Sequence, residues 1–367
     1  MKFIVSQQTL ATALNVVSKG IMSNATIPVL AGIRIEAAMG TVEMQTTNLQ
    51  ISVRHAVAAN VEEEGVCVVS GRILQNVVKN LSDAPVIFED RGRVIEITCE
   101  KSHFRLNTLE ATDFPEFPDV EPARSVELPS ELLGRMVDKV YRVTSKDTSR
   151  PILSGVLLTV EDNTIRLVAT DSYRLAVCDT NTETSGVDEP FEVIVPGTTF
   201  HDVLNLPTMT ETVSIGITES QIVFFFGATT YISRRIEGNF PNFRALLPKS
   251  CTTTVHFDAS GLSKALKRVS VIANTNPSVR FDVDADASFM RLSSSSPDQG
   301  EAQETVSVEV EGQSVQIALN YHYVLDCASA TGQDTDVSLE LLGSMQPAVF
   351  KSYADINYLY LLMPVRL

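Results

Sequence analysis

The segment Pro151-Ile152-Leu153-Ser154-Gly155 has a near copy at Pro28-Val29-Leu30-Ala31-Gly32, which precedes it by 123 residues. The same offset relates four further pairs, namely Leu10 with Leu133, Thr41 with Thr164, Thr47 with Thr170, and Asn48 with Asp171. One offset that serves so many points is hard to obtain by chance and indicates an internal repeat. A repeat determines the architecture before any single motif does.

A Phe-Pro motif marks the end of the repeating unit. Residues 113–117 are Asp-Phe-Pro-Glu-Phe, residues 239–243 are Asn-Phe-Pro-Asn-Phe, and Pro364 follows Pro241 by a further 123 residues. Three units of about this length nearly exhaust the 367 residues. We therefore predict three similar domains, at residues 1–123, 124–250 and 251–367, each close to the commonest size of a domain.

Each predicted domain is α+β, with two helices and about eight mostly antiparallel strands, so that helices cover one face of the sheets. Hydrophobic periodicity and capping residues predict helices near residues 7–18, 71–81, 130–146, 196–206, 259–273 and 321–330. The serine-rich segment 293–300 is predicted to be a flexible loop.

The net charge is −16 and the isoelectric point is about 4.8. Taken as a sum, this acidity disfavours nucleic-acid binding, because contacts to phosphate require Lys and Arg. The distribution of the charge matters more than the sum, since a local basic surface can bind phosphate on an acidic body.

Sequence motifs for catalysis are missing. The five cysteines, at positions 67, 99, 178, 251 and 327, have no metal-ligand spacing, and the sequence contains no glycine-rich phosphate loop. Asp171 could act as an acid or base, but its repeat counterpart Asn48 favours a role in a turn. We expect no cofactor, no metal and no enzyme activity. The sequence has neither a signal peptide nor a run long enough to span a membrane, so we expect a cytoplasmic protein.

Basic residues gather on three of the predicted helices, which hold little acid. They are Arg72 and Lys79 near 71–81, then Arg135, Lys139, Arg142 and Lys146 near 130–146, and Lys264, Lys267 and Arg268 near 259–273. The spacing of 4, 3 and 4 residues in the second group predicts one stripe along a helix. A single helix of this kind is usually an ordinary solvated face, whereas equivalent helices in repeated units predict one joined basic surface that follows a phosphate backbone.

The apolar end of the chain, Tyr358 to Leu367, admits two interpretations. It is either an edge strand that completes the third domain, or an exposed apolar patch in which Met363 packs against partners.

The threefold unit, the segment Ala169-Thr170-Asp171-Ser172-Tyr173-Arg174-Leu175-Ala176-Val177, the Phe-Pro motifs and the ending Met363-Pro364-Val365-Arg366-Leu367 together resemble the bacterial beta sliding clamp family. Members of this family are processivity subunits of the replicative DNA polymerase. The resemblance covers the whole chain. It implies a homodimer in which two chains join head to tail into a closed ring around double-stranded DNA, held without sequence preference. The helices would line the hole and the sheets would form the outer wall.

The resemblance also implies a hydrophobic pocket for short peptides of the replicative polymerase, the clamp loader, and other polymerases and repair proteins. Its residues, carried over by position, are Leu153, Thr170, Ser172, Tyr173, Arg174, Leu175, Pro241, Leu246, Leu361, Leu362, Met363, Pro364, Val365 and Arg366.

The resemblance places the interface between the two chains at Phe104 and Leu106 of the first domain and at Val271 and Ile272 of the third. Two other function classes remain open from the residues alone. One is an enzyme whose site is assembled from dispersed carboxylates and histidines. The other is a repeat-built scaffold that binds only proteins.

Overall fold

A computed structural model describes residues 1–22, 26–147, 149–181, 190–273, 277–331 and 337–366. Each predicted domain follows the same order: a strand, a helix, several strands, a second helix and three strands. Every strand pairing among the described residues is antiparallel. The predicted α+β fold class is confirmed.

The elements of the first repeat are β1 (Lys2–Ser6), α1 (Gln7–Val17), β2 (Gly32–Ala38), β3 (Thr41–Thr47), β4 (Ile51–Ala58), β5 (Asn60–Glu63), β6 (Gly65–Ser70), α2 (Gly71–Lys79), β7 (Pro85–Asp90), β8 (Val94–Cys99) and β9 (Ser102–Leu109). Those of the second repeat are β10 (Arg124–Pro129), α3 (Ser130–Val140), β11 (Gly155–Glu161), β12 (Thr164–Thr170), β13 (Arg174–Asn181), β14 (Phe191–Pro196), α4 (Gly197–Leu204), β15 (Thr212–Ile217), β16 (Gln221–Phe226) and β17 (Thr229–Arg234).

Those of the third repeat are β18 (Thr253–Phe257), α5 (Ala259–Val269), β19 (Ser278–Asp284), β20 (Phe289–Ser296), β21 (Gly300–Ser307), β22 (Glu309–Gly312), β23 (Val315–Asn320), α6 (Tyr321–Ala330), β24 (Val337–Leu341), β25 (Ala348–Ser352) and β26 (Asn357–Leu362). Three short 3₁₀ helices matter for the site: η4 (Tyr141–Val143), η5 (Pro151–Ser154) and η6 (Phe243–Leu246).

Side-chain caps determine where several helices begin. The Ser6 hydroxyl accepts a hydrogen bond from the backbone N–H of Thr9 at the start of α1. The side chains of Asp258 and Asn320 cap α5 and α6 in the same way. Such caps satisfy backbone N–H groups that have no partner within the helix, and each contributes about 1 kcal/mol.

The sheets cross the repeat boundaries. A 13-stranded sheet has the order β10-β15-β16-β17-β4-β3-β2-β6-β9-β8-β7-β1-β5, a nine-stranded sheet has the order β14-β11-β12-β13-β26-β25-β24-β18-β22, and a four-stranded sheet has the order β21-β20-β19-β23. The strands of the middle repeat are therefore shared between two sheets. As a result, the contacts divide the chain into two compact units: unit 1 is Met1–Leu133 with Asp202–Arg235, and unit 2 is Gly134–His201 with Ile236–Leu367.

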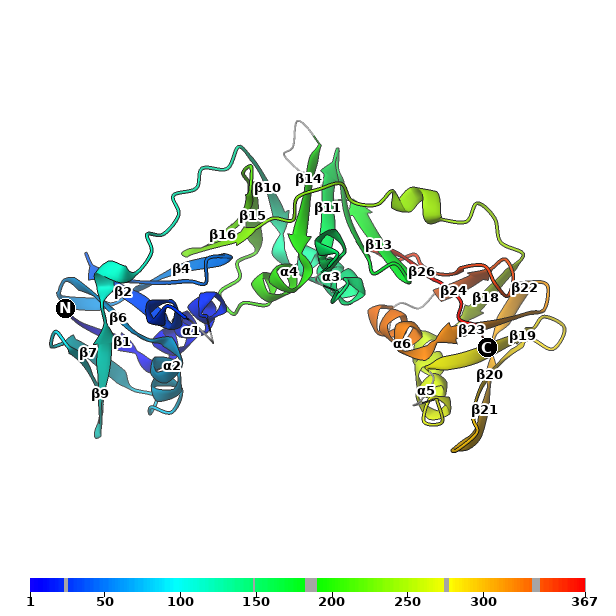
Figure 1. Ribbon diagram of the computed structural model, residues 1–367, viewed down its shortest axis with the longest axis horizontal. Coiled ribbons are helices and arrows are strands. Elements are labelled where there is room, and N and C mark those ends of the chain that lie inside the picture. Colours follow the sequence, from blue (N-terminus) through cyan, green and yellow to red (C-terminus); the bar gives the residue numbers. More distant parts are fainter. Residues whose placement is uncertain (23–25, 148, 182–189, 274–276, 332–336, 367) are drawn as a thin grey trace. The chain divides into compact units, whose positions relative to one another are not determined.

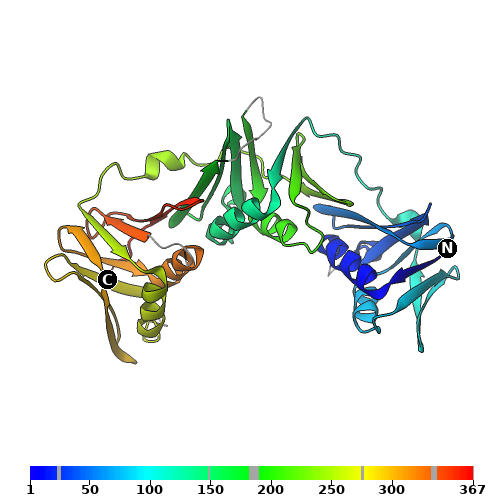
Figure 2. The same cartoon turned by 180° about the vertical axis from the view of Figure 1, so that it is seen from behind.

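Helices lie against one face of the sheets in each unit. In unit 1, α1 and α2 lie side by side, and in unit 2, α5 and α6 do the same (Figures 1 and 2). The hydrophobic face of α1 is buried at Leu10, Leu14 and Val17, as the helical spacing predicts.

The prediction of a flexible loop at 293–300 is wrong for residues 293–296, whereas residues 297–299 form the turn between β20 and β21. Residues 289–296 form β20, and Ser294 and Ser296 are buried while Ser295 is exposed, which is the alternation of a strand. The Ser294 hydroxyl donates a hydrogen bond to the Val269 carbonyl of α5, at 2.8 Å. Small polar side chains therefore serve here where a strand passes close beneath a helix.

Candidate partner-binding site

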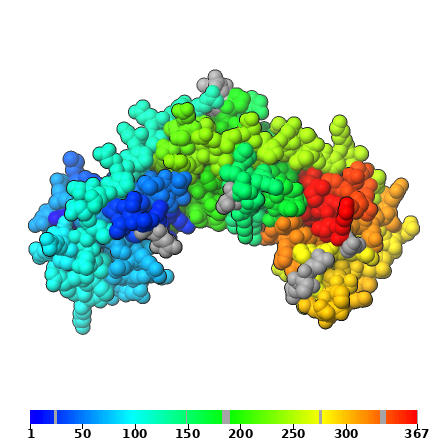
Figure 3. Space-filling view, viewed as in Figure 1, coloured from blue at the N-terminus to red at the C-terminus, as the bar shows by residue number. Residues whose placement is uncertain are grey.

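Strand pairing brings two segments of the predicted pocket together in unit 2. β13 pairs with β26, so that Arg174 lies opposite Leu362 and Leu175 opposite Leu361. The pairing continues past the strand ends, because the Met363 N–H donates to the Tyr173 carbonyl at 2.9 Å. Figure 3 shows the C-terminal residues, in red, at the surface beside the green segment of the middle repeat.

A buried apolar cluster lies under these two segments. Leu175 and Leu361 pack in it with residues that sequence reasoning missed, namely Leu157, Val168, Val177, Ile194, Phe243 and Val349. Phe243 belongs to the Phe-Pro motif, so the repeat marker itself was the signal for this residue. The motif therefore marks the end of a repeat in the sequence, and in the structure its Phe243 belongs to the buried apolar cluster.

Exposed apolar side chains lie close in the chain to members of this cluster, Leu175, Phe243 and Leu361. Tyr173 is 65% exposed, Leu246 53% and Met363 42%. Large apolar side chains are seldom exposed together in one patch unless the patch binds something. Met345, 57% exposed, lies in the turn that precedes β25, and Ala348 of β25 pairs with Leu362. This register places Met345 at the same end of the sheet as Met363. The sequence did not predict Met345 as a site residue. Its only sign in the sequence is that an apolar residue stands in a turn.

The remaining predicted pocket residues differ in accessibility. Ser172, Pro241 and Arg366 are exposed, Leu153, Pro364 and Val365 are half-buried, and Thr170 and Leu362 are buried. Leu362 is fully buried and is absent from the apolar cluster, because it alternates in direction with Leu361 along β26. Its contribution is to the sheet.

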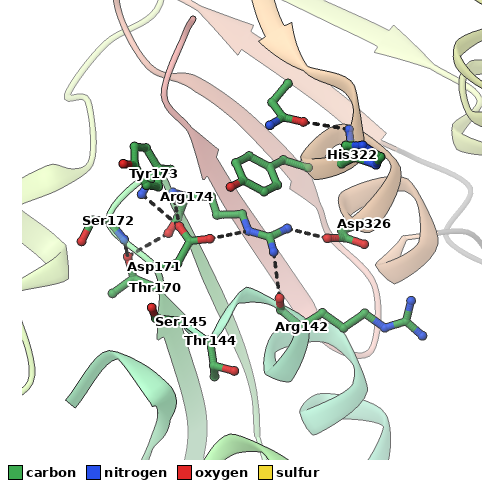
Figure 4. Close-up of polar contacts among 12 residues, drawn as sticks. Arg142, Thr144, Ser145, Thr170, Asp171, Ser172, Tyr173, Arg174, His322 and Asp326 are labelled. Carbon is green, nitrogen blue, oxygen red and sulfur yellow. Dashed lines mark hydrogen bonds and ion pairs between the residues drawn. The ribbon is translucent and has the colours of Figure 1, made fainter. Parts of the chain in front are cut away.

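The charged side chain of Arg174 points into the protein, so only its backbone, which pairs with Leu362, belongs to the site. Its side chain is only 8% exposed, and Nε and Nη1 form ion pairs with Asp171 (3.0 Å) and Asp326 (2.6 Å). Nη1 also donates to the Tyr360 hydroxyl at 3.2 Å, and Nη2 donates to the Arg142 carbonyl at 2.8 Å. Figure 4 shows the guanidinium between the two carboxylates.

This arrangement satisfies a buried guanidinium. Burial alone would lower the pKa of Arg174, but Tyr360, Asp326 and Asp171 raise it above its usual value, so the side chain stays charged. The ring of Tyr323 lies 4.1 Å from the guanidinium carbon. Asp326 and Tyr323 lie on α6, about 150 residues away in sequence, and no local pattern pointed to them.

The C-terminal segment is not an edge strand. β26 pairs with β13 on one side and with β25 on the other, so it is internal to the nine-stranded sheet. Beyond it, the Val365 N–H donates to the Ala318 carbonyl at 2.9 Å, which ties the end of the chain to β23.

The predicted basic stripe of the second repeat is wrong in part. α3 ends at Val140, Arg142 lies in η4, and Lys146 follows it, because the chain turns back and the Ser145 N–H donates to the Leu153 carbonyl at 2.7 Å. The 3.6-residue period therefore relates only Arg135 and Lys139.

Several of the basic residues already have partners within unit 2. Arg135 pairs with Asp355 at 2.7 Å and Arg268 with Glu304 at 2.6 Å, while Lys139 donates to the Ala330 carbonyl at 2.6 Å. Six others form no ion pair with any described residue: Arg72, Lys79, Arg142, Lys146, Lys264 and Lys267. These six are the cations most available to an external anion.

The predicted interface residues are accessible in each unit. Phe104 is 36% exposed on β9 in unit 1, and Leu106 is half-buried. Val271 is 61% exposed and Ile272 half-buried in the turn after α5, which ends at Val269 rather than near residue 273.

Two other kinds of site are missing from the part of the chain that the structure describes. No group of three or more His, Cys, Asp or Glu side chains is placed to hold a metal ion. No described helix is long and apolar enough to cross a membrane.

Comparisons with known proteins agree along the whole chain. Three family models match, described as the N-terminal, central and C-terminal domains of the DNA polymerase III beta subunit, at residues 1–118, 127–242 and 244–366. A beta sliding clamp of Streptomyces coelicolor is 30% identical, and one of Bacillus subtilis is 28% identical, each with all of both chains covered.

Solved structures agree with these relatives. The DNA polymerase III beta subunit of Thermotoga maritima has 28% sequence identity and a TM-score of 0.92, over 100% of this chain and 99% of that one. The sliding clamp of Bacillus subtilis has 27% identity and a TM-score of 0.93 over the same shares. The chain therefore belongs to the DNA polymerase III beta subunit family, the beta sliding clamps.

Proposed function

We propose that this protein is the sliding clamp of a replicative DNA polymerase: two chains close a ring around duplex DNA and tether the polymerase for processive synthesis. The observation that carries the proposal is the match of three successive clamp domains along the whole chain. The activity is binding and not catalysis. Topology, rather than affinity, keeps a closed ring on DNA, so an acidic protein can still serve.

The six unpaired cations, together with the paired basic residues of α3 and α5, are proposed to face DNA. Lysine and arginine contacts to phosphate carry no base readout, so they hold no fixed register and permit sliding. The acidic remainder of the surface would repel DNA from other faces.

The apolar cluster and its exposed border are proposed as the site for partner peptides. Tyr173, Leu246, Met345 and Met363 offer large side chains around a buried floor, the arrangement in which a few anchors carry most of the binding energy. Methionine adapts to different partners because its side chain is flexible and polarisable. Replicative polymerase, clamp loader, other polymerases and repair proteins are the expected partners.

The dimer is proposed to form between β9 of one chain and the α5–β21 region of the other. β21 is an edge strand of its sheet, and β9 pairs with β6 only at Thr108 and Leu109, which leaves residues 102–107 with one free edge. Free edges pair readily with another chain. We expect Ile272→Ala to weaken the dimer by about 1–3 kcal/mol, measured by sedimentation on dilution. Unchanged dissociation would remove Ile272 from the interface.

The three-domain division at 1–123, 124–250 and 251–367 and the cytoplasmic location complete the proposal. The compact units differ from these domains because some strands of the middle repeat belong to the sheet of the first repeat and the others to a sheet of the third. A head-to-tail contact closes a ring when its rotation divides the circle, and two chains of three similar domains would give sixfold pseudosymmetry.

Retention on circular DNA tests the function. The protein is loaded by a clamp loader onto nicked plasmid, the complex is isolated, and the DNA is then linearised. A ring is released on cutting, whereas a protein held by affinity stays bound. The double variant Lys264→Gln/Lys267→Gln should reduce loading more than Arg268→Gln, because Glu304 already neutralises Arg268. Retention on linear DNA with free ends would contradict encirclement.

A further inference from the structure

The turn that presents Tyr173 is held from beneath by one buried network. Asp171 Oδ1 accepts hydrogen bonds from the backbone N–H groups of Tyr173 (2.9 Å) and Arg174 (3.0 Å), and Oδ2 accepts from Arg174 Nε. Ser172 has a φ of +78°, a conformation that costs a residue other than glycine about 1 kcal/mol or more. The turn therefore depends on Asp171, and the orientation of Asp171 depends on Arg174.

Asp326 supplies the shortest ion pair of Arg174, and it comes from outside the partner site. It lies on α6, and its carboxylate makes no ion pair with any other described residue. It also lines a cavity of about 410 Å³ with Arg142 and Tyr360, two other residues that bond the same guanidinium. Figure 4 shows this side of the network facing away from Tyr173.

Without Asp326, the buried guanidinium would have one carboxylate in place of two. A buried charge that loses a partner gains by moving toward solvent or toward its remaining acceptors. Either movement pulls on Asp171, and with it on the Tyr173 carbonyl that receives the Met363 N–H. Loss of Asp326 would therefore loosen two exposed apolar anchors at once.

We propose that Asp326 is a positioning residue for partner peptides, acting through Arg174 to hold the Asp171–Arg174 turn in the binding conformation before the peptide arrives. The inference rests on the proposed function of the site. It assigns a role to a helix residue that does not border the apolar surface. A preorganised turn spares the peptide the free energy of selecting a minor conformation.

The test uses the full-length dimer and a fluorescein-labelled peptide with Leu and Phe anchors that binds the unaltered protein. We expect Asp326→Asn to lower the association rate constant about tenfold, because a turn that is competent a tenth of the time captures one encounter in ten. The dissociation rate constant should stay within twofold. Asp326→Glu should restore the association rate constant to within about threefold, since it keeps the charge on α6.

Asp355→Asn is the matched control. Asp355 lines the same cavity and pairs with another arginine, Arg135, at 2.7 Å, but it makes no contact with Arg174. Its rate constants should match those of the unaltered protein. Equal losses in Asp355→Asn and Asp326→Asn, or a loss expressed only in faster dissociation, would overturn the positioning role.

A fluorescent reporter measures the turn without peptide. The chain has no tryptophan, so Tyr173→Trp places a single one in the turn. Adding Asp326→Asn should lower its fluorescence anisotropy, and an unchanged value would contradict the proposal.

If Asp326→Asn fails to fold, Tyr360→Phe, which deletes one hydroxyl bonded to Arg174, should still lower the association rate constant two- to threefold. Met363→Asp tests the site itself: if it leaves peptide binding intact, the proposed peptide site is wrong, whatever the result at Asp326.

Discussion

Two turns of this chain share a backbone conformation, but only the second contains a buried arginine. The first, residues 47–51, joins β3 to β4, and the second, residues 170–174, joins β12 to β13. In the first, Asn48 Oδ1 accepts hydrogen bonds from the backbone N–H groups of Gln50 (3.0 Å) and Ile51 (2.7 Å). In the second, Asp171 accepts the same two bonds.

The agreement extends to the strained position. Leu49 and Ser172 both have left-handed backbones, with φ of +70° and +78°. The N–H group of each donates to the hydroxyl of the threonine two residues earlier, Thr47 or Thr170, at 3.1 and 3.3 Å. The predicted turn role of Asp171 is thus confirmed, and its counterpart was the right guide.

The exposed positions differ, Leu49 and Gln50 against Ser172 and Tyr173, but the buried difference lies at the first residue of the strand after each turn. Position 51 is a half-buried isoleucine, whereas position 174 is an arginine buried among two carboxylates. The Asn-to-Asp exchange adds the second oxygen that Arg174 Nε requires. A repeat can therefore keep the backbone geometry of a turn while an Asn-to-Asp and an Ile-to-Arg exchange add a buried ion pair to it.

Arg174→Ala should break the comparison most strongly. It leaves Asp326 without an ion pair among the described residues and Asp171 with only its two backbone N–H donors, and losing one member of a buried pair costs about 3–5 kcal/mol. We expect peptide affinity to fall more than 100-fold. Calorimetry should also show a lower melting temperature for unit 2. Ile51→Ala is the matched change in the first turn and should leave peptide affinity unaltered. Tight peptide binding by Arg174→Ala would show that the network is dispensable.

Asp171→Asn should sharpen the comparison by giving the second turn the chemistry of the first. The amide oxygen can still accept both backbone N–H groups, so the turn should survive, but the ion pair with Arg174 is lost. We expect a cost of about 1–2 kcal/mol in unfolding and a three- to tenfold loss of peptide affinity. Asn48→Asp, the reciprocal change, should alter neither by a measurable amount. A 100-fold loss in Asp171→Asn would mean that the charge, rather than the turn, recognises the peptide.

Much of the fold was predictable from the sequence because the repeat reports it more than once. The helix at 321–330 agrees with prediction to the residue, and the helices at 7–17 and 71–79 agree to within two residues. The strand at 65–70 was missed, because three consecutive buried residues, Cys67, Val68 and Val69, hide the alternation that marks a strand. The basic stripe extended too far because its spacing continued after the helix had ended.

The site was predictable to a smaller extent. The resemblance named the segments that β13 and β26 bring together, but it could not show that Arg174 points inward. An arginine in an exposed-looking turn is expected in solvent, and its carboxylate partner Asp326 lies 152 residues away. Only the packing of α6 against the sheet reveals that pair.

A third test compares the strands after the two turns. His55 of β4 and Cys178 of β13 occupy equivalent positions at the offset of 123 residues, and both are buried. Burial lowers the pKa of His55 below its usual 6.5. The unfolded chain therefore binds a proton at higher pH than the folded unit does, so the stability from neutral His55 is complete above about pH 6.5 and is lost as pH falls below it.

We expect calorimetry to show that lowering the pH from 7.5 to 5.5 costs the unaltered protein about 3 °C more in Tm than it costs His55→Gln. His55 Nδ1 lies 2.8 Å from the Thr229 hydroxyl, which a glutamine can still reach as donor or acceptor. Equal pH dependence in both proteins would remove His55 as the source. Cys178→Ser should not change the pH dependence in this range, because burial raises the pKa of that thiol.

The smallest expected effect concerns the strain that the two turns share. Glycine at a left-handed position relieves about 1–2 kcal/mol, but its freedom in the unfolded chain returns about 0.5–1 kcal/mol. Leu49→Gly and Ser172→Gly should therefore each stabilise the protein by at most about 1.5 kcal/mol, measured as the difference in Tm from Leu49→Ala and Ser172→Ala. Equal gains in stability at the two positions would mean that the strain comes from the shared turn geometry and that the Arg174 network adds none. A clearly larger gain at Ser172 would mean that the network itself compresses the second turn, so that part of its ion-pair energy is stored in the backbone that presents Tyr173.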